Sequence, residues 1–520
     1  MRMAVRNPRP GARKPKSESR KPATAKELRI VMIASEAQPF SKTGGLADVA
    51  TALPKALGRL GHHVTLITPR YRGIADGPIV DSLSIEVAGH RFAANLIEAR
   101  IGPGARVLLV DCPELYDRSG IYYDAHGDYP DNAVRFAFLS AAAIDWASQK
   151  DDPFDIVHAH DWQGGLAPIY SRALAVPKVP GVPKVSAVFT IHNLAYQGIF
   201  EKSWVPKLGL DWSDYTISGF EFFDRLSFMK AGISFADAIT TVSPTYAEEI
   251  QRPEYGHGLD GVIRARRDAL VGILNGIDHD EWNPLADSFL PAPFDAESLD
   301  GKAAAKRALL EAFGFTITDE LLARPVIGMV SRMVDQKGLD LIEAAAGDLA
   351  MLDATFVIVG TGEPRYQNMW TNLSRWRADR ISVLVGFDER RAHLVEGGAD
   401  IFLMPSRFEP CGLNQMYSLR YGTVPVVRAV GGLVDTVRPY NPRNGQGNGF
   451  LFSEYQPTAM MRALGAALTA YPNKRIWTRL QKNGMRADFS WDRSAGEYVK
   501  MYRALRRRNA ANRPASKRQR

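Results

Sequence analysis

A lysine and two adjacent glycines, in the stretch SKTGGLADVA at residues 41–50, are the first feature of the chain that could do chemistry. The stretch joins a hydrophobic run to an amphipathic one, which predicts a strand-to-helix turn. Glycine amides at the start of a helix can receive a phosphate, and Lys42 would add a positive charge. Gly44 and Gly45 therefore form a candidate anion site. A tight turn with a solvated lysine is the competing interpretation.

A second pair of cations follows a later hydrophobic run. Arg332 and Lys337, in SRMVDQKG at residues 331–338, flank a loop that ends at a glycine before a helical pattern. Two cations beside a helix start suit a diphosphate, whereas solvated surface charge is the alternative. The position of this loop at the end of an expected strand favours the diphosphate.

The stretch SRFEPCGLNQ, residues 406–415, places a carboxylate just before an expected helix. Glu409 can accept hydrogen bonds from sugar hydroxyls, while the main-chain amides of Cys411, Gly412 and Leu413 can face an anion. The competing interpretations are a carboxylate that complements the helix dipole and a cysteine that packs as a small hydrophobic residue.

Histidines end two further expected strands, in HAHDWQ and TIHN. His158 and His160 resemble a pair of metal ligands, but no third ligand has convincing spacing. Histidine and asparagine beside Asp161 can equally bind the hydroxyls of a neutral sugar. The carboxylates of DHD, residues 278–280, could hold a divalent ion, although one such tripeptide in a turn is usually incidental. No metal site is therefore predicted.

The candidate residues above can act together only if the strands that precede them bring them to one edge of a sheet. Short buried runs recur in the first half, joined by helical patterns, of which the first is expected to be interrupted at Pro54. A second series of such runs begins at PVIGMVSRM and ends at TVPVVRAVGG. Strands that alternate with helices predict parallel sheets, and ligands lie at the carboxyl ends of their strands. We therefore expect an α/β protein with two doubly wound domains.

Composition limits the classes of protein to be considered. The chain has 520 residues, of which 45% are hydrophobic and 23% charged, as in a globular protein with two cores. Only two cysteines are present, so a disulfide framework is excluded and a reducing compartment is expected. The sequence contains no apolar run of the length that spans a membrane.

The net charge of +8 is misleading as a sign of nucleic-acid binding. Residues 1–29 carry a net charge of +8 and residues 506–520 one of +7, which leaves −7 for residues 30–505. Both ends are rich in Pro, Ser, Ala and Arg, a composition that predicts disordered basic tails. A nucleic-acid partner is therefore not expected.

The expected domain boundaries follow from these patterns. The turn-rich stretch GIDHDEWNP predicts a hinge near residues 270–290. We expect two tails, two Rossmann-like domains and a terminal helix, which divide the chain into residues 1–27 (tail), 28–275 (first domain), 276–490 (second domain), 491–508 (helix) and 509–520 (tail).

Seven stretches taken together resemble one enzyme family. They are KTGGLADV, HAHDW, TIHNLAYQG, VSPTYAEEI, LNGID, SRMVDQKG and SRFEPCGLNQMYSLRYG, in this order over residues 28–505. The set resembles the bacterial glycogen synthases that use ADP-glucose and the related plant starch synthases. The resemblance implies the GT-B glycosyltransferase fold, in which two Rossmann-like domains face each other across a central cleft.

The implied reaction extends an α-1,4-glucan such as glycogen by one glucose from ADP-glucose, with retention at the anomeric carbon and release of ADP. The implied partners are ADP-glucose and the glucan, with no cofactor, no metal and no membrane. Ala47, in GGLADV, is typical of bacterial members, and it indicates glycogen as the product and a bacterial cytoplasm as the location.

The resemblance also assigns roles to residues of this chain. It implies catalytic roles for Arg332 and Lys337 on the donor diphosphate, for Glu409 on the hydroxyls of the donor glucose, and for His192 near the reacting carbon. The residues that it places on the substrates are Lys42, Gly44, Gly45, Asp48, Asp161, Asn193, Asn275, Phe387, Cys411, Gly412 and Leu413. Phe387 is expected to stack on the adenine.

One departure and two alternatives remain open. Tyr417 stands where the wider GT-B group often has a second glutamate, which leaves the ribose contact unassigned. One alternative function is a GT-B transferase that uses UDP-glucose and a small acceptor. The other is a glucan-binding protein without catalytic activity, against which the presence of Lys42, Arg332, Lys337 and Glu409 argues.

Overall fold

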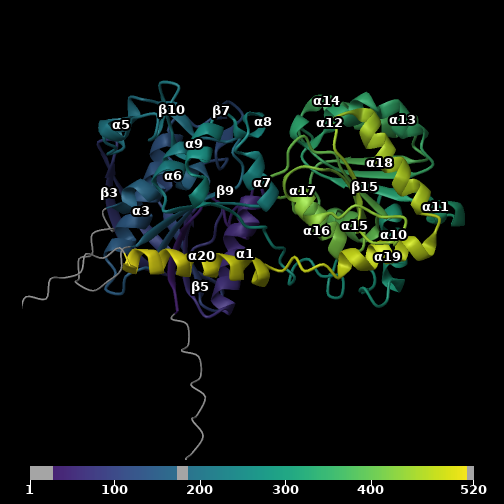
Figure 1. Cartoon of the computed structure of the whole chain (residues 1–520), viewed down its shortest axis with the longest axis horizontal. Coiled ribbons are helices and arrows are strands. Elements are labelled where there is room, and N and C mark those ends of the chain that lie inside the picture. Colours follow the sequence, from purple (N-terminus) through teal and green to yellow (C-terminus); the bar gives the residue numbers. More distant parts are fainter. Residues whose placement is uncertain (1–26, 173–184, 512–520) are drawn as a thin grey trace, which may run out of the picture.

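The computed structural model describes residues 27–172 and 185–511, which form two α/β units beside each other (Figure 1). Of the two expected basic tails, only residue 27 and residues 509–511 are among the described residues. Each unit contains one large sheet with helices on both of its faces.

The first unit is built on a nine-stranded sheet in the order β14-β13-β9-β8-β1-β2-β5-β4-β3. The sheet is parallel from β14 to β5, as expected, and β1 lies between β2 and β8, so that Val31 is level with Thr65 and Val157. The strands are β1 (Arg29–Ile33), β2 (His63–Pro69), β3 (Ile79–Val87), β4 (His90–Gly102), β5 (Ala105–Asp111), β8 (Ile156–His160), β9 (Ser186–Ile191), β13 (Ala238–Thr241) and β14 (Leu270–Gly272).

An antiparallel hairpin at the edge of this sheet was not expected from the sequence. β4 pairs with β5, and β3 pairs with β4 at the rim. Most residues of β3 are exposed or half-buried, because an edge strand has a neighbour on one side only. Its mixed sequence therefore lacks the continuous apolar run that identifies a central strand.

The first helix continues through Pro54, contrary to the expected interruption. α1 (Gly45–Arg59) contains Pro54 as a buried interior residue. A proline inside a helix loses one hydrogen bond and costs about 3 kcal/mol. Val49, Leu53 and Leu57 of α1 are completely or almost completely buried, and this tertiary packing offsets that cost.

The other elements of the first unit surround the large sheet. α1 covers one face, and α3, α4 and α6 cover the other. The elements are α2 (Pro113–Tyr116), α3 (Asn132–Ser148), α4 (Ala167–Tyr170), α5 (Trp204–Lys207), α6 (Phe228–Phe235), α7 (Pro244–Glu249), α8 (Pro253–Gly256), α9 (Asp260–Ala265), β6 (Tyr123–Asp124), β7 (Gly127–Asp128), β10 (Ile199–Glu201), β11 (Glu221–Phe222) and β12 (Arg225–Ser227).

The second unit has a six-stranded parallel sheet in the order β17-β16-β15-β18-β19-β20. Its strands are β15 (Val326–Val330), β16 (Thr355–Gly360), β17 (Ile381–Val385), β18 (Ile401–Met404), β19 (Val424–Arg428) and β20 (Phe450–Phe452). Its helices are α10 (Asp300–Ala312), α11 (Asp319–Ala323), α12 (Leu339–Ala344), α13 (Ala346–Met351), α14 (Pro364–Trp376), α15 (Glu389–Gly398), α16 (Asn414–Arg420), α17 (Gly431–Thr436), α18 (Pro457–Ala470) and α19 (Lys474–Met485).

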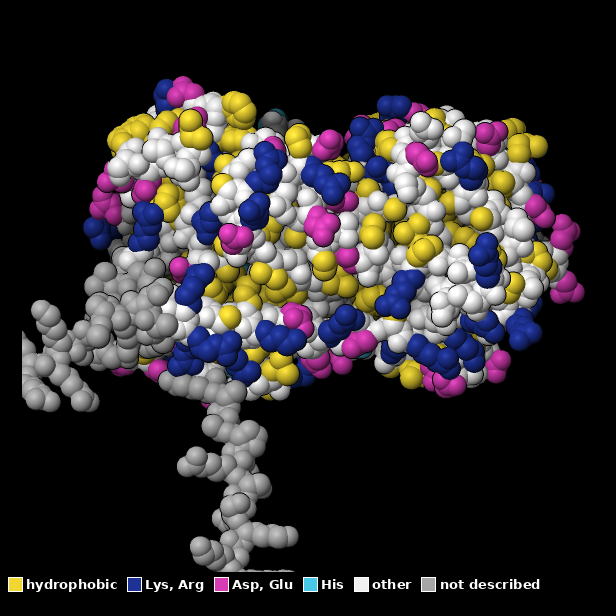
Figure 2. Space-filling view, in the orientation of Figure 1, with side chains coloured by type: hydrophobic (Ala, Val, Ile, Leu, Met, Phe, Trp, Pro, Cys, Tyr) yellow, Lys and Arg dark blue, Asp and Glu magenta, His cyan; other side chains and the backbone are white. Residues whose placement is uncertain are grey.

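The chain crosses between the units twice. The first crossing runs from β14 to α10, and the second joins α19 to α20 (Trp491–Ala511), which returns to the first unit and packs on α1 (Figure 1). The two crossings touch, because the main-chain N–H of Ile277 donates to the carbonyl of Phe489 over 2.8 Å. Lys and Arg side chains gather along the lower edge of the molecule, where α20 runs (Figure 2).

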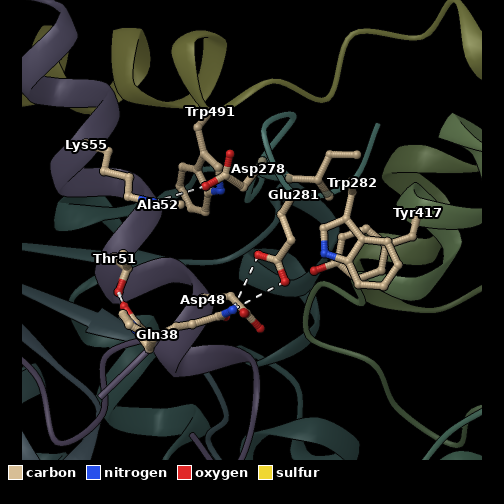
Figure 3. A pocket seen from close by; sticks show the side chains of 13 residues that line it. Gln38, Asp48, Thr51, Ala52, Lys55, Asp278, Glu281, Trp282, Tyr417 and Trp491 are labelled. Atoms are coloured by element: carbon tan, nitrogen blue, oxygen red, sulfur yellow. Dashed lines mark hydrogen bonds and ion pairs between the residues drawn. The ribbon is translucent and has the colours of Figure 1, made fainter. Parts of the chain in front are cut away.

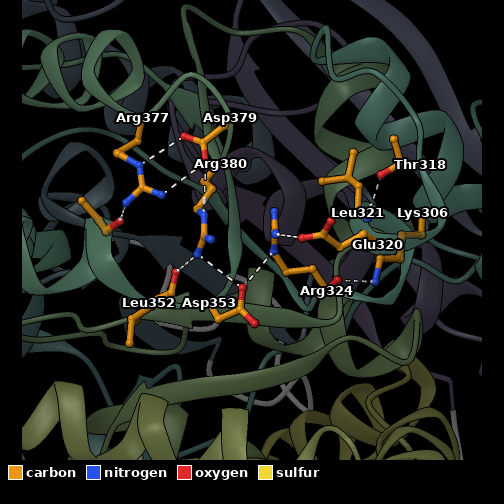
Figure 4. Close-up of polar contacts among 11 residues, drawn as sticks. Lys306, Thr318, Glu320, Leu321, Arg324, Leu352, Asp353, Arg377, Asp379 and Arg380 are labelled. Atoms are coloured by element: carbon orange, nitrogen blue, oxygen red, sulfur yellow. Dashed lines mark hydrogen bonds and ion pairs between the residues drawn. The ribbon is translucent and has the colours of Figure 1, made fainter.

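Ion pairs connect the segments that precede β15, β16 and β17 in the second unit (Figure 4). Asp353 accepts from Arg324 over 3.0 Å and from Arg380 over 3.3 Å, and Arg377 pairs with Asp379 over 3.1 Å. Asp353 and Asp379 are largely exposed, so these pairs contribute only about 0–1 kcal/mol each.

A buried ion pair lies beneath this exposed network. Lys306 of α10 donates to Asp400 over 2.7 Å, and both side chains are almost fully buried. The same Asp400 oxygen accepts from the main-chain N–H of Val326 over 2.9 Å, and Lys306 also donates to the carbonyl of Arg324. This pair therefore fixes the start of β15 against β18 and α10.

We predict that Lys306→Met lowers the free energy of unfolding by about 3–5 kcal/mol, because it leaves Asp400 as a buried carboxylate without its cation. Urea-induced unfolding followed by circular dichroism measures the change. The control is Arg307→Met, which alters the exposed neighbour on the same helix. Equal stability of the two variants would contradict the role given to the pair.

Candidate active site

A cavity of about 200 Å³ lies between the two units. One wall is the turn at Thr43 and Gly44, which follows β1. The opposite wall comes from the second unit, at the carboxyl ends of β15 and β18. Its lining residues from the second unit are Met329, Val330, Ser331, Arg332, Lys337, Leu403, Met404, Ser406 and Asn414. The expected meeting of the loops from both halves is therefore present.

Lys337 and Glu409 form an ion pair across two neighbouring loops of the second unit. The ammonium of Lys337 donates to the two carboxylate oxygens of Glu409 over 3.0 and 2.7 Å. Ser406 donates to Glu409 over 3.0 Å. Glu409 is only 6% exposed, so these donors compensate for the loss of water around its charge.

Arg332 stands beside this pair with fewer fixed contacts. Its guanidinium donates to Gln336 over 2.9 Å. The loop between Arg332 and Lys337 ends at Gly338, where φ is +75°. A Cβ at Gly338 would lie 2.1 Å from the carbonyl oxygen of Pro405, so only glycine lets the two loops approach this closely.

Lys42, directly before the turn that forms the first wall, is paired with a carboxylate of the following helix, α1. It donates to Asp48 over 2.6 Å and to the side chain of Gln38 over 3.2 Å. Burial raises the pKa of Asp48, against the lowering effect of Lys42. Lys42 itself is 46% exposed and so remains accessible to an anion.

Cys411, Gly412 and Leu413 form the bend that leads into α16. Burial raises the pKa of the Cys411 thiol to about 12, so this residue is a protonated, buried side chain and not a nucleophile. Gly412 has a φ of +72°, which favours glycine. A Cβ at Gly45 would lie 3.5 Å from the Leu413 side chain, so these two residues face each other across the cleft.

The residues after β8 and β9 form a compact group in the first unit. The carboxylate of Asp161 accepts from the main-chain N–H of His192 over 2.7 Å and from that of Asn193 over 3.4 Å. Burial raises the pKa of Asp161 to about 7. Repulsion from Glu36 adds to this rise. The φ of Asp161 is +52°, a strained value for this residue.

Of the three histidines of this region, His158 and His160 are fully buried and His192 is half-buried, and all three have neutral partners. The Nδ1 atom of His160 and the Nε2 atom of His192 lie 3.0 Å apart. His158 contacts the hydroxyls of Tyr502 and Thr190 over 2.7 and 2.6 Å. Burial lowers the pKa of all three, that of His160 to about 3. Within residues 27–172 and 185–511, no group of three or more His, Cys, Asp or Glu side chains is arranged to hold a metal.

Asn275 and Phe387 occupy contrasting positions. Asn275 is 5% exposed, its main-chain N–H donates to the Val242 carbonyl over 3.3 Å, and its side-chain oxygen has no hydrogen-bond partner in the described part of the chain. Phe387 follows the edge strand β17 and is 78% exposed. It does not line this cavity.

A second cavity, of about 220 Å³, lies beside the first crossing (Figure 3). Tyr417 lines it and stacks on Trp282 with ring centres 3.8 Å apart. The position at which the wider GT-B group often has a second glutamate is therefore packed against the crossing. Asp278, one of the carboxylates considered for a divalent ion, lies 3.5 Å from Lys55.

Hydrogen bonds join α7 and its N-cap, Ser243, to the second unit. Ser243 donates to the carbonyl of Pro410 over 2.6 Å, and the main-chain N–H of Thr245 donates to Asp435 over 2.9 Å. Glu249 accepts from the main-chain N–H of Gly431 over 3.0 Å. These contacts hold the residues next to Glu409 against the first unit.

Sequence reasoning missed Glu36, Ser406 and Glu281. Glu36 accepts hydrogen bonds from the main chain at Thr43 and Gly44. Glu281 accepts from Gln38 over 3.3 Å and belongs to the second cavity (Figure 3). Of these three, only Glu36 could have been found from the sequence, because it is a carboxylate in the short segment between the first strand and the glycine turn.

In the part of the chain that the structure describes, no helix has the length and apolar character needed to cross a membrane.

Comparisons with known proteins agree with this geometry. The family model for the starch synthase catalytic domain matches residues 29–265, and that for glycosyl transferases group 1 matches residues 317–483. A glycogen synthase of Anaeromyxobacter sp. (strain Fw109-5) is 48% identical, over 92% of this chain and 99% of its own. One of Koribacter versatilis is 45% identical, over 91% of this chain and 98% of its own.

Solved structures give the same result. The catalytic domain of starch synthase IV from Arabidopsis thaliana, bound to ADP and acarbose, superposes with a TM-score of 0.84 at 33% identity, over 93% of this chain and 100% of that one. A sucrose-phosphate synthase from Thermosynechococcus elongatus shares the fold alone, with a TM-score of 0.59 at 18% identity. The expected GT-B architecture is confirmed, and the chain belongs to the bacterial glycogen synthase family.

Proposed function

We propose that this protein transfers glucose from ADP-glucose to the 4-hydroxyl of an α-1,4-glucan, with retention at the anomeric carbon and release of ADP. The observation that carries the proposal is the cavity between the units. Arg332 and Lys337 line one wall, and the turn at Thr43 and Gly44, directly after Lys42, forms the other. The glycogen synthase relatives support a glucan as acceptor.

The cations are the source of catalysis in this proposal. Arg332 and Lys337 bind the diphosphate and offset the charge that grows on the departing ADP. An ammonium group has three N–H donors, and Lys337 uses two contacts on Glu409, so one donor remains for a phosphate oxygen. Lys42 approaches the same diphosphate from the other unit.

Glu409 accepts hydrogen bonds from the donor glucose, next to the main-chain amides of Cys411, Gly412 and Leu413. Asp48 holds Lys42, and Gly44 and Gly45 let the turn approach the sugar. Asp161, His192, Asn193 and Asn275 line the glucose and acceptor side. Phe387, with its largely exposed ring, stacks on the adenine.

Closure of the units excludes water, which would otherwise intercept the glucosyl group. The acceptor hydroxyl attacks from the face that the diphosphate leaves, and a phosphate oxygen of the leaving group takes its proton. Glu409 is engaged with Lys337 and Ser406, which argues against its use as a nucleophile in a covalent intermediate.

The compartment that fits this function is the bacterial cytoplasm. The two glycogen synthases compared above come from bacteria. Both cysteines are free and buried, as is usual in a reducing compartment.

The direct test incubates the purified chain with ADP-glucose and glycogen and measures released ADP and glucan length. We expect transfer from ADP-glucose and much slower transfer from UDP-glucose, because the proposed donor is the adenine nucleotide. Equal use of both donors would refute the donor assignment, and no transfer to glucan from either would refute the proposed function.

We predict that Lys337→Ala lowers kcat about 100- to 1,000-fold, because a donor to the developing phosphate charge is lost. Steady-state assays of ADP release measure the effect. The control is Lys500→Ala, which removes an exposed lysine paired with Glu497 over 2.6 Å on α20. Full activity of Lys337→Ala would remove this residue from the diphosphate.

We predict that Glu409→Ala also lowers kcat at least about 100-fold, because the donor glucose loses an acceptor and Lys337 loses its anchor. The matched control is Glu497→Ala, which breaks the same type of pair on the surface. Normal turnover in Glu409→Ala, with unchanged thermal unfolding, would exclude contact between this carboxylate and the donor.

A further inference from the structure

Glu36 is a buried carboxylate behind the Lys42 turn, and it is held entirely by neutral donors. It lies three residues after the end of β1 and is 2% exposed. The main-chain N–H of Thr43 and the hydroxyl of Tyr122 donate to it at short range. The hydroxyl of Thr43 donates to it over 2.6 Å, and the main-chain N–H of Gly44 over 3.4 Å.

These contacts change the interpretation of the glycine turn. The amides of Thr43 and Gly44 are among those that the motif would offer to a phosphate, but both point toward Glu36. Thr43 and Gly44 nevertheless line the cavity, and a Cβ at Gly44 would meet no atom within 4 Å. The amides of this turn therefore point toward Glu36, and the open side of Gly44 points toward the cleft.

A network of buried hydroxyls supports Glu36 from behind. Because the Tyr122 hydroxyl donates to Glu36, it accepts from the Ser35 hydroxyl over 2.7 Å. Tyr71 donates to the main-chain carbonyl of Ser35 over 2.9 Å. The ring of Tyr122 packs against Phe136, with centres 5.9 Å apart. The carboxylate of Glu36 is thus fixed by segments far apart in the sequence.

We propose that Glu36 is a positioning residue for glucosyl transfer: it holds the turn at Thr43 and Gly44 so that Lys42 and the glycine face are presented to the donor. Glu36 does not line the cavity, so it acts through the turn. This inference rests on the proposed function. It assigns contact with the anion to the side chains of Lys42, Arg332 and Lys337, and none to the amides of Thr43 and Gly44.

Two substitutions separate positioning from charge. Glu36→Gln keeps the shape: its oxygen can accept from the two amides, and its NH₂ group can donate to the hydroxyls of Thr43 and Tyr122, which can reverse their roles. Glu36→Met keeps the volume and removes every acceptor. We expect kcat/KM for ADP-glucose within about threefold of wild type for Glu36→Gln and a loss of roughly 10- to 100-fold for Glu36→Met.

Binding is measured apart from turnover, by calorimetric titration with ADP. Glu36→Met should weaken ADP binding, and Glu36→Gln should not. The control is Glu396→Gln, which neutralises another carboxylate, 1% exposed and bonded to Ser418 over 2.6 Å, in the second unit. Its ADP affinity and kcat/KM should match wild type, whatever its thermal stability. Tyr122→Phe should show a smaller loss than Glu36→Met.

The outcomes are distinct. Wild-type kinetics in a folded Glu36→Met variant would overturn the proposal. If Glu36→Met does not fold, Glu36→Gln tests the proposal. A loss of activity in Glu36→Gln as large as that of Lys337→Ala would show that the negative charge itself is needed, and it would overturn the positioning role. Absence of ADP binding and transfer in the wild type would instead refute the proposed function itself.

Discussion

The ion pair between Lys337 and Glu409 is the contact on which the second wall of the cavity depends. The two residues lie on loops that follow β15 and β18, which are neighbours in the sheet. Glu409 is almost completely buried, and a buried carboxylate without a cation or several hydrogen-bond donors would be strongly unfavourable. The pair therefore fixes both loops relative to each other and leaves the outer face of Lys337 toward the cleft.

The first wall meets the same requirement in another way. Glu36 is as buried as Glu409, but main-chain amides and hydroxyls replace the cation. Both walls are thus organised by a buried carboxylate directly behind the surface that faces the cavity. The cations Lys42 and Arg332 are held by exposed contacts and can adapt to a bound anion.

Much of this arrangement could be predicted from the sequence, because strands and loop residues leave local signals. The parallel strands of both sheets, and the residues at their carboxyl ends, follow from hydrophobic runs that end in polar residues. The hairpin of β3 and β4 was missed because an edge strand is only half covered. The helix through Pro54 was missed because its stability comes from packing.

The sequence by itself determined the two α/β halves, the loops that carry Lys42, Arg332, Lys337 and Glu409, and the family. Only the tertiary structure decided that the amides of Thr43 and Gly44 point toward Glu36, that Tyr417 packs on Trp282, and that α20 returns to the first unit. The reason is physical: periodicity encodes which residues are buried, but hydrogen-bond partners far apart in the chain are set only when the packed elements meet.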